Sequence, residues 1–329
     1  MSNQTLSIIN KATKVKEKYD ILTFDTHERY QTQLCKTGHN FYSFRYEDCK
    51  EWDDTYAPKP DNYYVLPPNS IMNGLDFDFI LSQSKFGQFQ TAHRINEVLR
   101  LPMISLEHTL PIPSWPESQT HMFRQMVGDI NVFISEYSIR EWNIQGNHDV
   151  IHHSVDSETF YPKEAEKTND VLSVVNDFVN RDYCCNYSGW KRITQDMNVK
   201  LVGTSKDGSS KPAESVADLV NEYCSSKVFL NTSTVSPIPT TLLEAMSCGS
   251  AVVSTATCMI PEIIENGVNG FISNDEEELK AYITQLLQDE ELRTTMGKQA
   301  RETILTKFSE EKFINNWNNI FKKAYEVVG

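Results

Sequence analysis

One stretch in the second half of the chain constrains the fold more than any other. It consists of three consecutive segments: residues 236–249 (SPIPTTLLEAMSCG), 251–254 (AVVS) and 260–270 (IPEIIENGVNG). Thr240 and Thr241 are suited to cap the start of a helix, and Gly249 is suited to end it. The apolar run 251–254 then has the composition of a short buried strand. The pattern therefore predicts a loop, a helix, a strand, a second loop and a short helix, in that order.

The start of the predicted helix has the chemistry of an anion site. The first N–H groups of a helix lack intrahelical partners and carry a partial positive charge, which favours a phosphate. Leu242, Leu243 and Met246 share one apolar face, so we expect Glu244 on the open side, one turn inside the helix. A carboxylate in that place can accept hydrogen bonds from vicinal hydroxyls. A phosphate at the helix start and a diol one turn deeper together describe a nucleotide.

The same residues carry a family resemblance. Residues 243–254 (LEAMSCGSAVVS) with 261–271 (PEIIENGVNGF) resemble the donor-site motif of GT-B glycosyltransferases of family 4. The resemblance implies an α/β protein with the GT-B fold, in which two Rossmann-like doubly wound domains face a central cleft. It also implies transfer of a sugar from a nucleotide-diphosphate donor, UDP-sugar in the first place, to a hydroxyl acceptor with retention of configuration. Such a hexosyl- or pentosyltransferase requires no cofactor beyond its donor.

Strands and helices alternate along the whole chain, which favours parallel sheets covered by helices. We expect an acceptor-side Rossmann-like domain over 1–160 and a nucleotide-sugar-binding Rossmann-like domain over 161–307. The segment around 163–170 has the charged composition of a connection between domains. By the resemblance, residues 308–329 form a C-terminal helix that crosses back to the first domain.

Composition excludes several classes of protein. The hydrophobic content of 39% suits a packed globular chain, and the net charge of −14 argues against purely electrostatic binding to nucleic acid. Seven scattered cysteines form no disulfide framework and no paired zinc motif. The chain has no apolar run long enough to span a membrane and no signal-peptide pattern at its start, so we expect a cytoplasmic protein. The oligomeric state is left open.

The resemblance assigns residues around the donor. Glu244 matches the second glutamate of the family's E-x7-E pattern, which binds the ribose, while Ser236 stands where the first glutamate is expected. Asn176 occupies the position of a usual arginine, and Arg181 that of a usual lysine, both near the diphosphate. Arg181 and Ser236 are therefore expected on the catalytic side. The remaining donor-binding residues are Asn176, Thr240, Thr241, Leu242 and Glu244. Serine brings no charge to the sugar, so donor identity and rate are in question.

Three residues of the first half are candidates for the acceptor side. His27 and Glu28 follow the strand expected at 19–24, in a loop that begins at Asp25, where the family usually has glycines. His108 follows the strand expected at 101–106, where family members commonly hold a histidine near the reacting carbon. The alternatives are that His27 caps a helix and that His108 is a buried histidine with a structural role.

A metal site is not expected. His148, His152 and His153 lie close together in the sequence, but they lack a further Cys or His at ligand spacing.

Several functions stay open at this point. The first is an active retaining glycosyltransferase, and the second is a nucleotide-sugar binding protein whose catalysis is weakened or lost. An oxidoreductase is disfavoured because no G-x-G-x-x-G follows a first strand. Residues 26–30 (THERY) and 105–110 (SLEHTL) are similar to phage-type glycosyltransferases, some of which modify hydroxymethylated bases in DNA. The acceptor stays unknown, with a DNA base, a saccharide, a lipid or a small metabolite all open, and a phage-encoded enzyme would act in the host cytoplasm.

Overall fold

The computed structural model describes residues 16–24, 27–45, 51–54, 57–67 and 70–326. Thr26 of the THERY segment and the start of the loop at Asp25 lie outside these residues. The chain forms two compact units. Unit 1 comprises Met1–His153 and Glu311–Gly329, and unit 2 comprises Ser154–Glu310.

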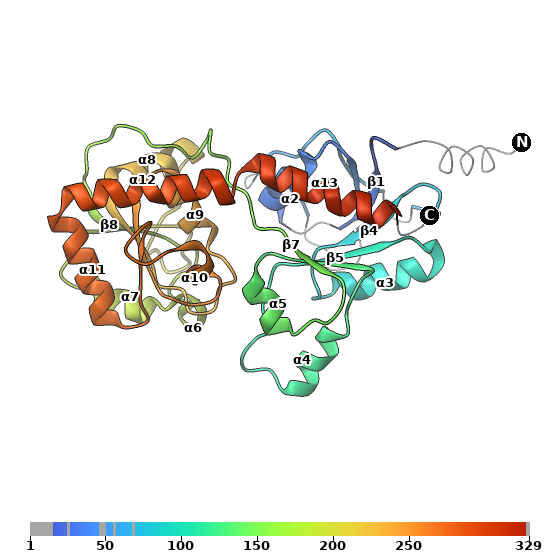
Figure 1. The fold of residues 1–329 in the computed structure, drawn as a ribbon, viewed down its shortest axis with the longest axis horizontal. Coiled ribbons are helices and arrows are strands. Elements are labelled where there is room, and N and C mark those ends of the chain that lie inside the picture. Colours follow the sequence, from blue (N-terminus) through green and yellow to red (C-terminus); the bar gives the residue numbers. More distant parts are fainter. Residues whose placement is uncertain (1–15, 25–26, 46–50, 55–56, 68–69, 327–329) are drawn as a thin grey trace, which may run out of the picture. The chain divides into compact units, whose positions relative to one another are not determined.

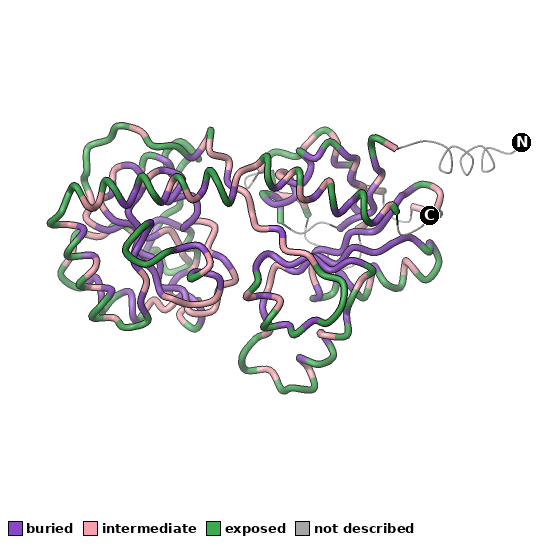
Figure 2. Tube along the Cα trace, viewed as in Figure 1, coloured by how far each residue is buried: buried purple, intermediate pink, exposed green. Residues whose placement is uncertain are grey.

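The described part of unit 1 is built on a seven-stranded sheet with the order β3-β2-β1-β4-β5-β6-β7. All neighbouring strands are parallel. The strands are β1 (Asp20–Thr23), β2 (Asn40–Ser43), β3 (Tyr63–Val65), β4 (Phe79–Ser82), β5 (Met103–Glu107), β6 (Ile130–Phe133) and β7 (His148–Val150). Every residue of β4, β5 and β6 is buried (Figure 2). Continuous burial of this kind is typical of parallel strands that are covered by helices on both faces.

The described helices of unit 1 connect successive strands along the chain, and one more follows unit 2 in the sequence (Figure 1). They are α2 (Glu28–Cys35), α3 (Gln88–Leu99), α4 (Glu117–Arg124), α5 (Glu136–Trp142) and α13 (Glu310–Glu326). Helix α13 contributes directly to the core. The indole of Trp317 donates a 3.1 Å hydrogen bond to the hydroxyl of Tyr30, and the ring of Phe321 stacks on Phe79 at 5.4 Å. Helix α13 therefore packs into the core of unit 1, although it follows unit 2 in the sequence.

Unit 2 is built on a five-stranded parallel sheet with the order β12-β11-β10-β8-β9. The strands are β8 (Asn169–Val174), β9 (Val199–Val202), β10 (Ser226–Asn231), β11 (Ala251–Ser254) and β12 (Phe271–Ile272). The helices are α6 (Asp182–Cys185), α7 (Tyr187–Ile193), α8 (Val216–Ser225), α9 (Thr240–Ser247), α10 (Ile260–Ile263), α11 (Glu276–Gln288) and α12 (Glu290–Lys307). The sequence of alternating strands and helices matches the predicted doubly wound α/β class.

Helices α9 and α12 pack closely because glycines line their contact. Gly249 has a φ of +74°, the left-handed conformation that ends a helix, which confirms the predicted stop. A Cβ atom added to Gly297 would lie 2.1 Å from the carbonyl oxygen of Gly249. Arg301 donates hydrogen bonds to the carbonyl oxygens of Ser247 and Phe160, so α12 also caps the end of α9.

The segment that joins unit 1 to unit 2 belongs to unit 2 from Ser154 onward, although residues up to 160 were expected in the first domain. The N–H of Val155 donates a 3.0 Å hydrogen bond to the carbonyl of Phe308. The hydroxyl of Ser247 donates a 2.6 Å hydrogen bond to the carbonyl of Phe160. These contacts with the end of α12 and with α9 attach the segment to unit 2.

Over the described residues, none of the helices combines the length and the apolar composition that crossing a membrane requires.

Candidate functional site

The strand order of unit 2 defines a point where ligands usually bind. From β8 the chain moves outward to β9, then returns across β8 to β10 on its other side. In open parallel sheets, ligands occupy the crevice at the carboxyl ends of the strands where the order reverses. Here that point lies between β8 and β10. The loop 175–181 follows β8, and the loop 232–239 follows β10 and leads into α9, so the predicted donor residues gather at this edge of the sheet.

Helix α9 begins without a side-chain cap. Its N-cap residue is Pro239, no side chain accepts from the first N–H groups, and Thr240 is already the first helical residue. The expectation that the threonines cap the helix is therefore wrong, because the N-cap position lies one residue earlier. Thr241 instead donates a 3.1 Å hydrogen bond from its hydroxyl to the carbonyl of Val174 at the end of β8. The start of α9 is thus fixed against the switch-point strand.

The loop after β8 holds Asn176 and Arg181, and both side chains are exposed. The Oδ1 atom of Asn176 accepts the N–H of Thr204 at 3.0 Å, which joins this loop to the one after β9. The Nη1 atom of Arg181 lies 3.4 Å from the carbonyl oxygen of Asn176. Among the described residues, Arg181 forms no ion pair with a carboxylate, so its charge is available to an anion.

Ser236 and Leu242 lie on the other side of the switch point. Ser236 is half-buried in the loop after β10, and its hydroxyl makes no hydrogen bond within the described structure. Leu242 is fully buried, and its N–H donates to the carbonyl of Pro239 at 3.0 Å. The predicted contact of Leu242 with the nucleotide does not fit this arrangement, because the side chain packs in the core and the N–H is already engaged.

Glu244 is buried and not on an open face as expected. Its side chain is 6% exposed, and its Oε2 atom accepts a 2.8 Å hydrogen bond from the hydroxyl of Tyr223. Tyr223 lies on α8, the helix before β10, and is 1% exposed. The hydroxyl from a neighbouring helix covers the carboxylate. No local pattern predicts this pair, because the two residues are 21 positions apart on different helices.

The predicted acceptor-side residues lie in unit 1 and differ in role. His27 is the N-cap of α2, where its Nδ1 atom accepts the N–H of Tyr30 at 3.4 Å, so the capping alternative describes its observed contact. Glu28 is 6% exposed, and its Oε1 atom accepts the N–H of Asp53 at 3.2 Å. This bond ties Glu28 to the segment around Asp53, and its contact with the acceptor stays a prediction.

His108 follows β5 and belongs to a cluster of aromatic rings. Its ring lies 4.4 Å from that of Tyr30 and 5.6 Å from that of His153, both edge to face. The Nε2 atoms of His108 and His153 are buried and have no hydrogen-bond partner among the described residues. Burial lowers the pKa of His108 well below its usual value, and nearby His153 and His27 lower it further. Burial likewise lowers the pKa of His153 to about 3. Both rings are therefore neutral at pH 7.

The sequence does not predict the buried lysine next to this cluster, Lys85. The N–H of Lys85 donates to Oε2 of Glu107 at 2.8 Å, and the Lys85 ammonium donates to the carbonyl of Met126. Burial lowers the pKa of Lys85 to about 8, although the Glu107 charge opposes the change. Since Glu107 precedes His108, these bonds fix the loop that presents the histidine. A single lysine after a strand carries no sequence signal for burial.

Among the described residues, no group of three or more His, Cys, Asp or Glu side chains is arranged to hold a metal ion.

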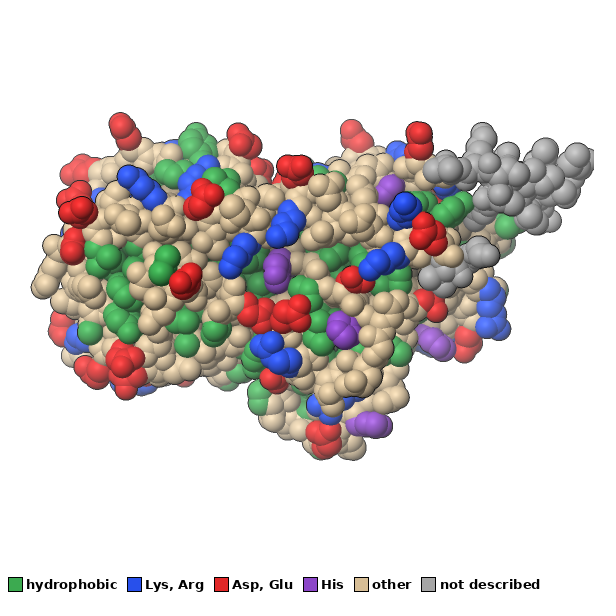
Figure 3. Space-filling view, in the orientation of Figure 1, with side chains coloured by type: hydrophobic (Ala, Val, Ile, Leu, Met, Phe, Trp, Pro, Cys, Tyr) green, Lys and Arg blue, Asp and Glu red, His purple; other side chains and the backbone are tan. Residues whose placement is uncertain are grey.

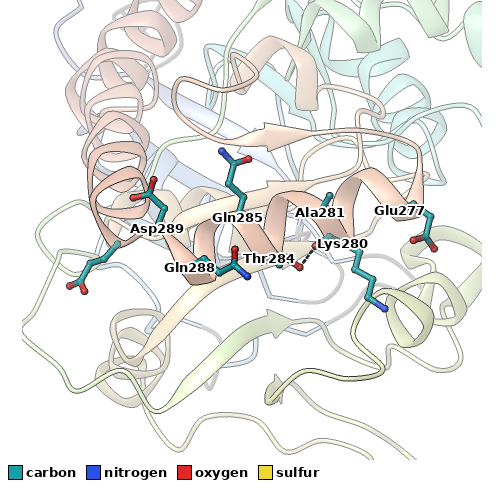
Figure 4. A pocket seen from close by; sticks show the side chains of 8 residues that line it. Glu277, Lys280, Ala281, Thr284, Gln285, Gln288 and Asp289 are labelled. Atoms are coloured by element: carbon teal, nitrogen blue, oxygen red, sulfur yellow. Dashed lines mark hydrogen bonds between the residues drawn. The ribbon is translucent and has the colours of Figure 1, made fainter.

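An open hollow lies along α11 and the turn after it, lined among others by Lys280, Gln285 and Asp289 (Figure 4). None of the predicted site residues lines it, so it is separate from the switch point.

Known proteins resemble the segment that contains α9. Residues 211–303, which include α8, α9 and α12 in large part, match the model of the glycosyl transferases group 1. Over 89 residues the chain is 37% identical to N-acetyl-alpha-D-glucosaminyl L-malate synthase of Bacillus anthracis, and over 90 residues 38% identical to sulfoquinovosyl transferase SQD2 of Arabidopsis thaliana. Each match covers 26% of this chain, and 23% and 18% of the respective relative. The chain thus spans about a quarter or less of the length of these curated relatives.

Solved structures match almost the whole chain. Sucrose-phosphate synthase of Thermosynechococcus elongatus superposes with a TM-score of 0.73 over 94% of this chain and 100% of that chain, at 13% identity. HepE of Anabaena, in complex with UDP, superposes with a TM-score of 0.72 over 93% of this chain and 100% of that chain, also at 13% identity. The chain has the GT-B fold. At this level of identity the likeness concerns the fold alone, and the predicted fold class is confirmed.

Proposed function

We propose that the protein is a retaining glycosyltransferase that moves a sugar from a nucleotide-diphosphate donor, UDP-sugar in the first place, to a hydroxyl acceptor. The observation that carries the proposal is the arrangement around α9. An uncapped helix start is fixed at the switch point by Thr241, and Glu244 lies one turn inside the helix. The match of residues 211–303 to the glycosyl transferases group 1 supports the same conclusion.

The leaving diphosphate gains negative charge as the bond to the sugar breaks, and the site offers two features that stabilise it. The uncapped N–H groups of α9 and the partial positive charge of the helix start face the end of the sheet. The exposed guanidinium of Arg181 adds a fixed positive charge after β8 and can hold a diphosphate through two N–H groups. In this proposal, Asn176 holds the loop after β8 in place while Arg181 meets the phosphate.

The sugar-facing position is the feature that distinguishes this chain. Ser236 stands where the resemblance leads one to expect a glutamate, and its hydroxyl makes no hydrogen bond within the described structure. A serine hydroxyl can bind a sugar hydroxyl, but it supplies no negative charge to a developing oxocarbenium ion. We therefore propose that Ser236 orients the donor sugar, and that charge stabilisation comes from the diphosphate itself.

The acceptor side is assigned to unit 1, with His108 as the residue that meets the acceptor hydroxyl. A neutral imidazole with a buried, unpartnered Nε2 atom can accept or donate one hydrogen bond. The DNA-base acceptor stays a prediction. Acidic and basic side chains are interspersed on the face drawn in Figure 3, and the net charge is −14. Neither feature favours a DNA backbone, which binds to concentrated positive charge.

A panel of sugar nucleotides tests the proposal. The purified protein is titrated calorimetrically with UDP, GDP, ADP and CDP, and then incubated with their sugar conjugates while release of the nucleoside diphosphate is followed. We expect binding and slow hydrolysis with at least one donor. Glu244→Gln should weaken that binding at least tenfold, whereas Glu291→Gln, a change at an exposed residue of α12, should not.

The outcomes separate the alternatives. A product with inverted anomeric configuration, read by proton NMR, would contradict retention. Binding without turnover on saccharide, metabolite or hydroxymethylated DNA acceptors would favour the nucleotide-sugar binding protein. Binding of no nucleotide at all would overturn the proposal.

A further inference from the structure

The pair formed by Tyr223 and Glu244 carries an inference about how the nucleotide is recognised. The hydroxyl of Tyr223 donates a 2.8 Å hydrogen bond to Oε2 of Glu244. The two side chains are only 1% and 6% exposed, so the bond lies in a region of low dielectric constant. A hydrogen bond to a charged acceptor in such surroundings is stronger than one in water. The carboxylate is therefore held in one orientation.

Tyr223 is itself rigidly placed. Its ring packs at 5.8 Å from the ring of Phe229 on β10 and at 6.4 Å from that of Phe160. Its backbone carbonyl accepts a 3.2 Å hydrogen bond from the hydroxyl of Ser250, which follows α9. The side chain and the backbone of Tyr223 are thus tied to the strand before α9 and to the turn after it. The hydroxyl acts as a fixed reference point for Glu244.

We propose that Tyr223 is a positioning residue for a ribonucleotide, and that it gives the site its preference for ribose over deoxyribose. This inference rests on the proposed function, in which Glu244 meets the ribose. An ionised carboxylate only accepts hydrogen bonds, and its two oxygens offer about four acceptor directions. With one direction fixed by Tyr223, the carboxylate faces a vicinal diol in a single orientation. Without the tyrosine hydroxyl the carboxylate loses a bond that orients it, and the ribose 2′-hydroxyl then loses its aligned partner.

The test compares UDP with 2′-deoxy-UDP. The two ligands differ only in the 2′-hydroxyl, from which Glu244 would accept a hydrogen bond. Affinities are measured calorimetrically for the full chain and for Tyr223→Phe, which removes only the hydroxyl. The matched control is Tyr282→Phe on α11, whose ring stacks on Phe271 at 4.4 Å. We expect the unsubstituted protein and the control to bind UDP more tightly than 2′-deoxy-UDP. In Tyr223→Phe, UDP affinity should fall about tenfold while 2′-deoxy-UDP affinity changes little.

Each outcome decides the question. If Tyr223→Phe keeps the ratio of the two affinities, or lowers both equally, the residue is merely structural and the inference is overturned while the proposed function stands. If the unsubstituted protein binds no nucleotide, the proposed function and the inference about Tyr223 are both overturned. Should Tyr223→Phe unfold below the assay temperature, the titrations of all three proteins are repeated at a lower temperature at which the variant is folded, and the same ratio of affinities decides the question.

Discussion

The hydroxyl of Thr241 donates a 3.1 Å hydrogen bond to the backbone carbonyl of Val174, and this bond joins the first turn of α9 to the last residue of β8. The two residues are 67 positions apart. They lie at the edge of the sheet where the strand order reverses, so the bond sets the distance between the helix start and the loop that carries Arg181.

Thr241→Val removes this bond with little change in shape. We expect the free energy of unfolding to fall by about 1 kcal/mol, as for a typical hydrogen bond. UDP affinity should fall severalfold, because the start of α9 is no longer held against β8. The control is Thr284→Val on the exposed face of α11. Among the described residues, the hydroxyl of Thr284 bonds to the carbonyl of Lys280 alone. Equal UDP affinity in both variants would contradict the role of Thr241.

Arg181→Ala should weaken UDP binding about tenfold, because the variant removes the exposed guanidinium from the loop after β8. The variant lacks one exposed charge–charge attraction that salt screens, so the affinity for UDP should also depend less on salt concentration. The control is Lys191→Ala, which removes an exposed positive charge on α7, away from the loop after β8. The expectation fails if the two variants lose affinity to the same extent.

Gly297→Ala should destabilise unit 2. The added Cβ would lie 2.1 Å from the carbonyl oxygen of Gly249, and a backbone atom cannot rotate away. Helix α12 must then shift from α9, at a cost of about 2 kcal/mol in the free energy of unfolding by urea. The neighbouring exposed Lys298→Ala should show no such loss. Unchanged unfolding of Gly297→Ala would mean that the helices tolerate a wider separation.

The two histidines whose Nε2 atoms are buried, His108 and His153, predict a loss of stability in acid. Burial holds the pKa of His153 at about 3 and that of His108 well below its usual value, whereas both titrate near 6.5 in the unfolded chain. Their folded-state pKa values are depressed, so the stability they contribute is complete above pH 6.5. Below pH 6.5 the unfolded state binds more protons, and each histidine lowers stability by up to about 1.4 kcal/mol per pH unit.

Urea unfolding between pH 7.5 and 5 measures this dependence. His153→Gln should reduce the slope of stability against pH, while the exposed His148→Gln serves as the control. An identical slope in the unsubstituted protein and in His153→Gln would show that His153 titrates alike in both states.

Local patterns were sufficient to predict the elements around α9. Gly249 ends the helix in the left-handed conformation, and Pro261 lies in the first turn of α10, because both effects depend on one residue's own backbone. The N-cap of α9 lies one residue earlier than expected, at Pro239. The hydroxyl of Thr241 bonds to β8 instead of capping the helix, a tertiary contact that the residues of the turn do not encode.

The environment of the site residues could not be read from spacing. Glu244 was expected on an open face, since its helix has a clear apolar side, yet Tyr223 on another helix covers it. Burial of Glu28 likewise depends on the segment around Asp53, which lies 25 positions away. Periodicity along one helix shows which residues face away from its apolar side, but a second element decides whether solvent reaches them.

The hydrogen bond between Val155 and Phe308 has a consequence for how the chain is organised. The residues by which the chain enters and leaves unit 2 are bonded neighbours, while α13 returns to the core of unit 1. In terms of chain topology, unit 2 is a domain inserted into a discontinuous host domain. Residues 154–310 form one uninterrupted segment whose two ends meet. Unit 1, by contrast, depends on two separate stretches of sequence, and removing α13 would take Trp317 and Phe321 from its core.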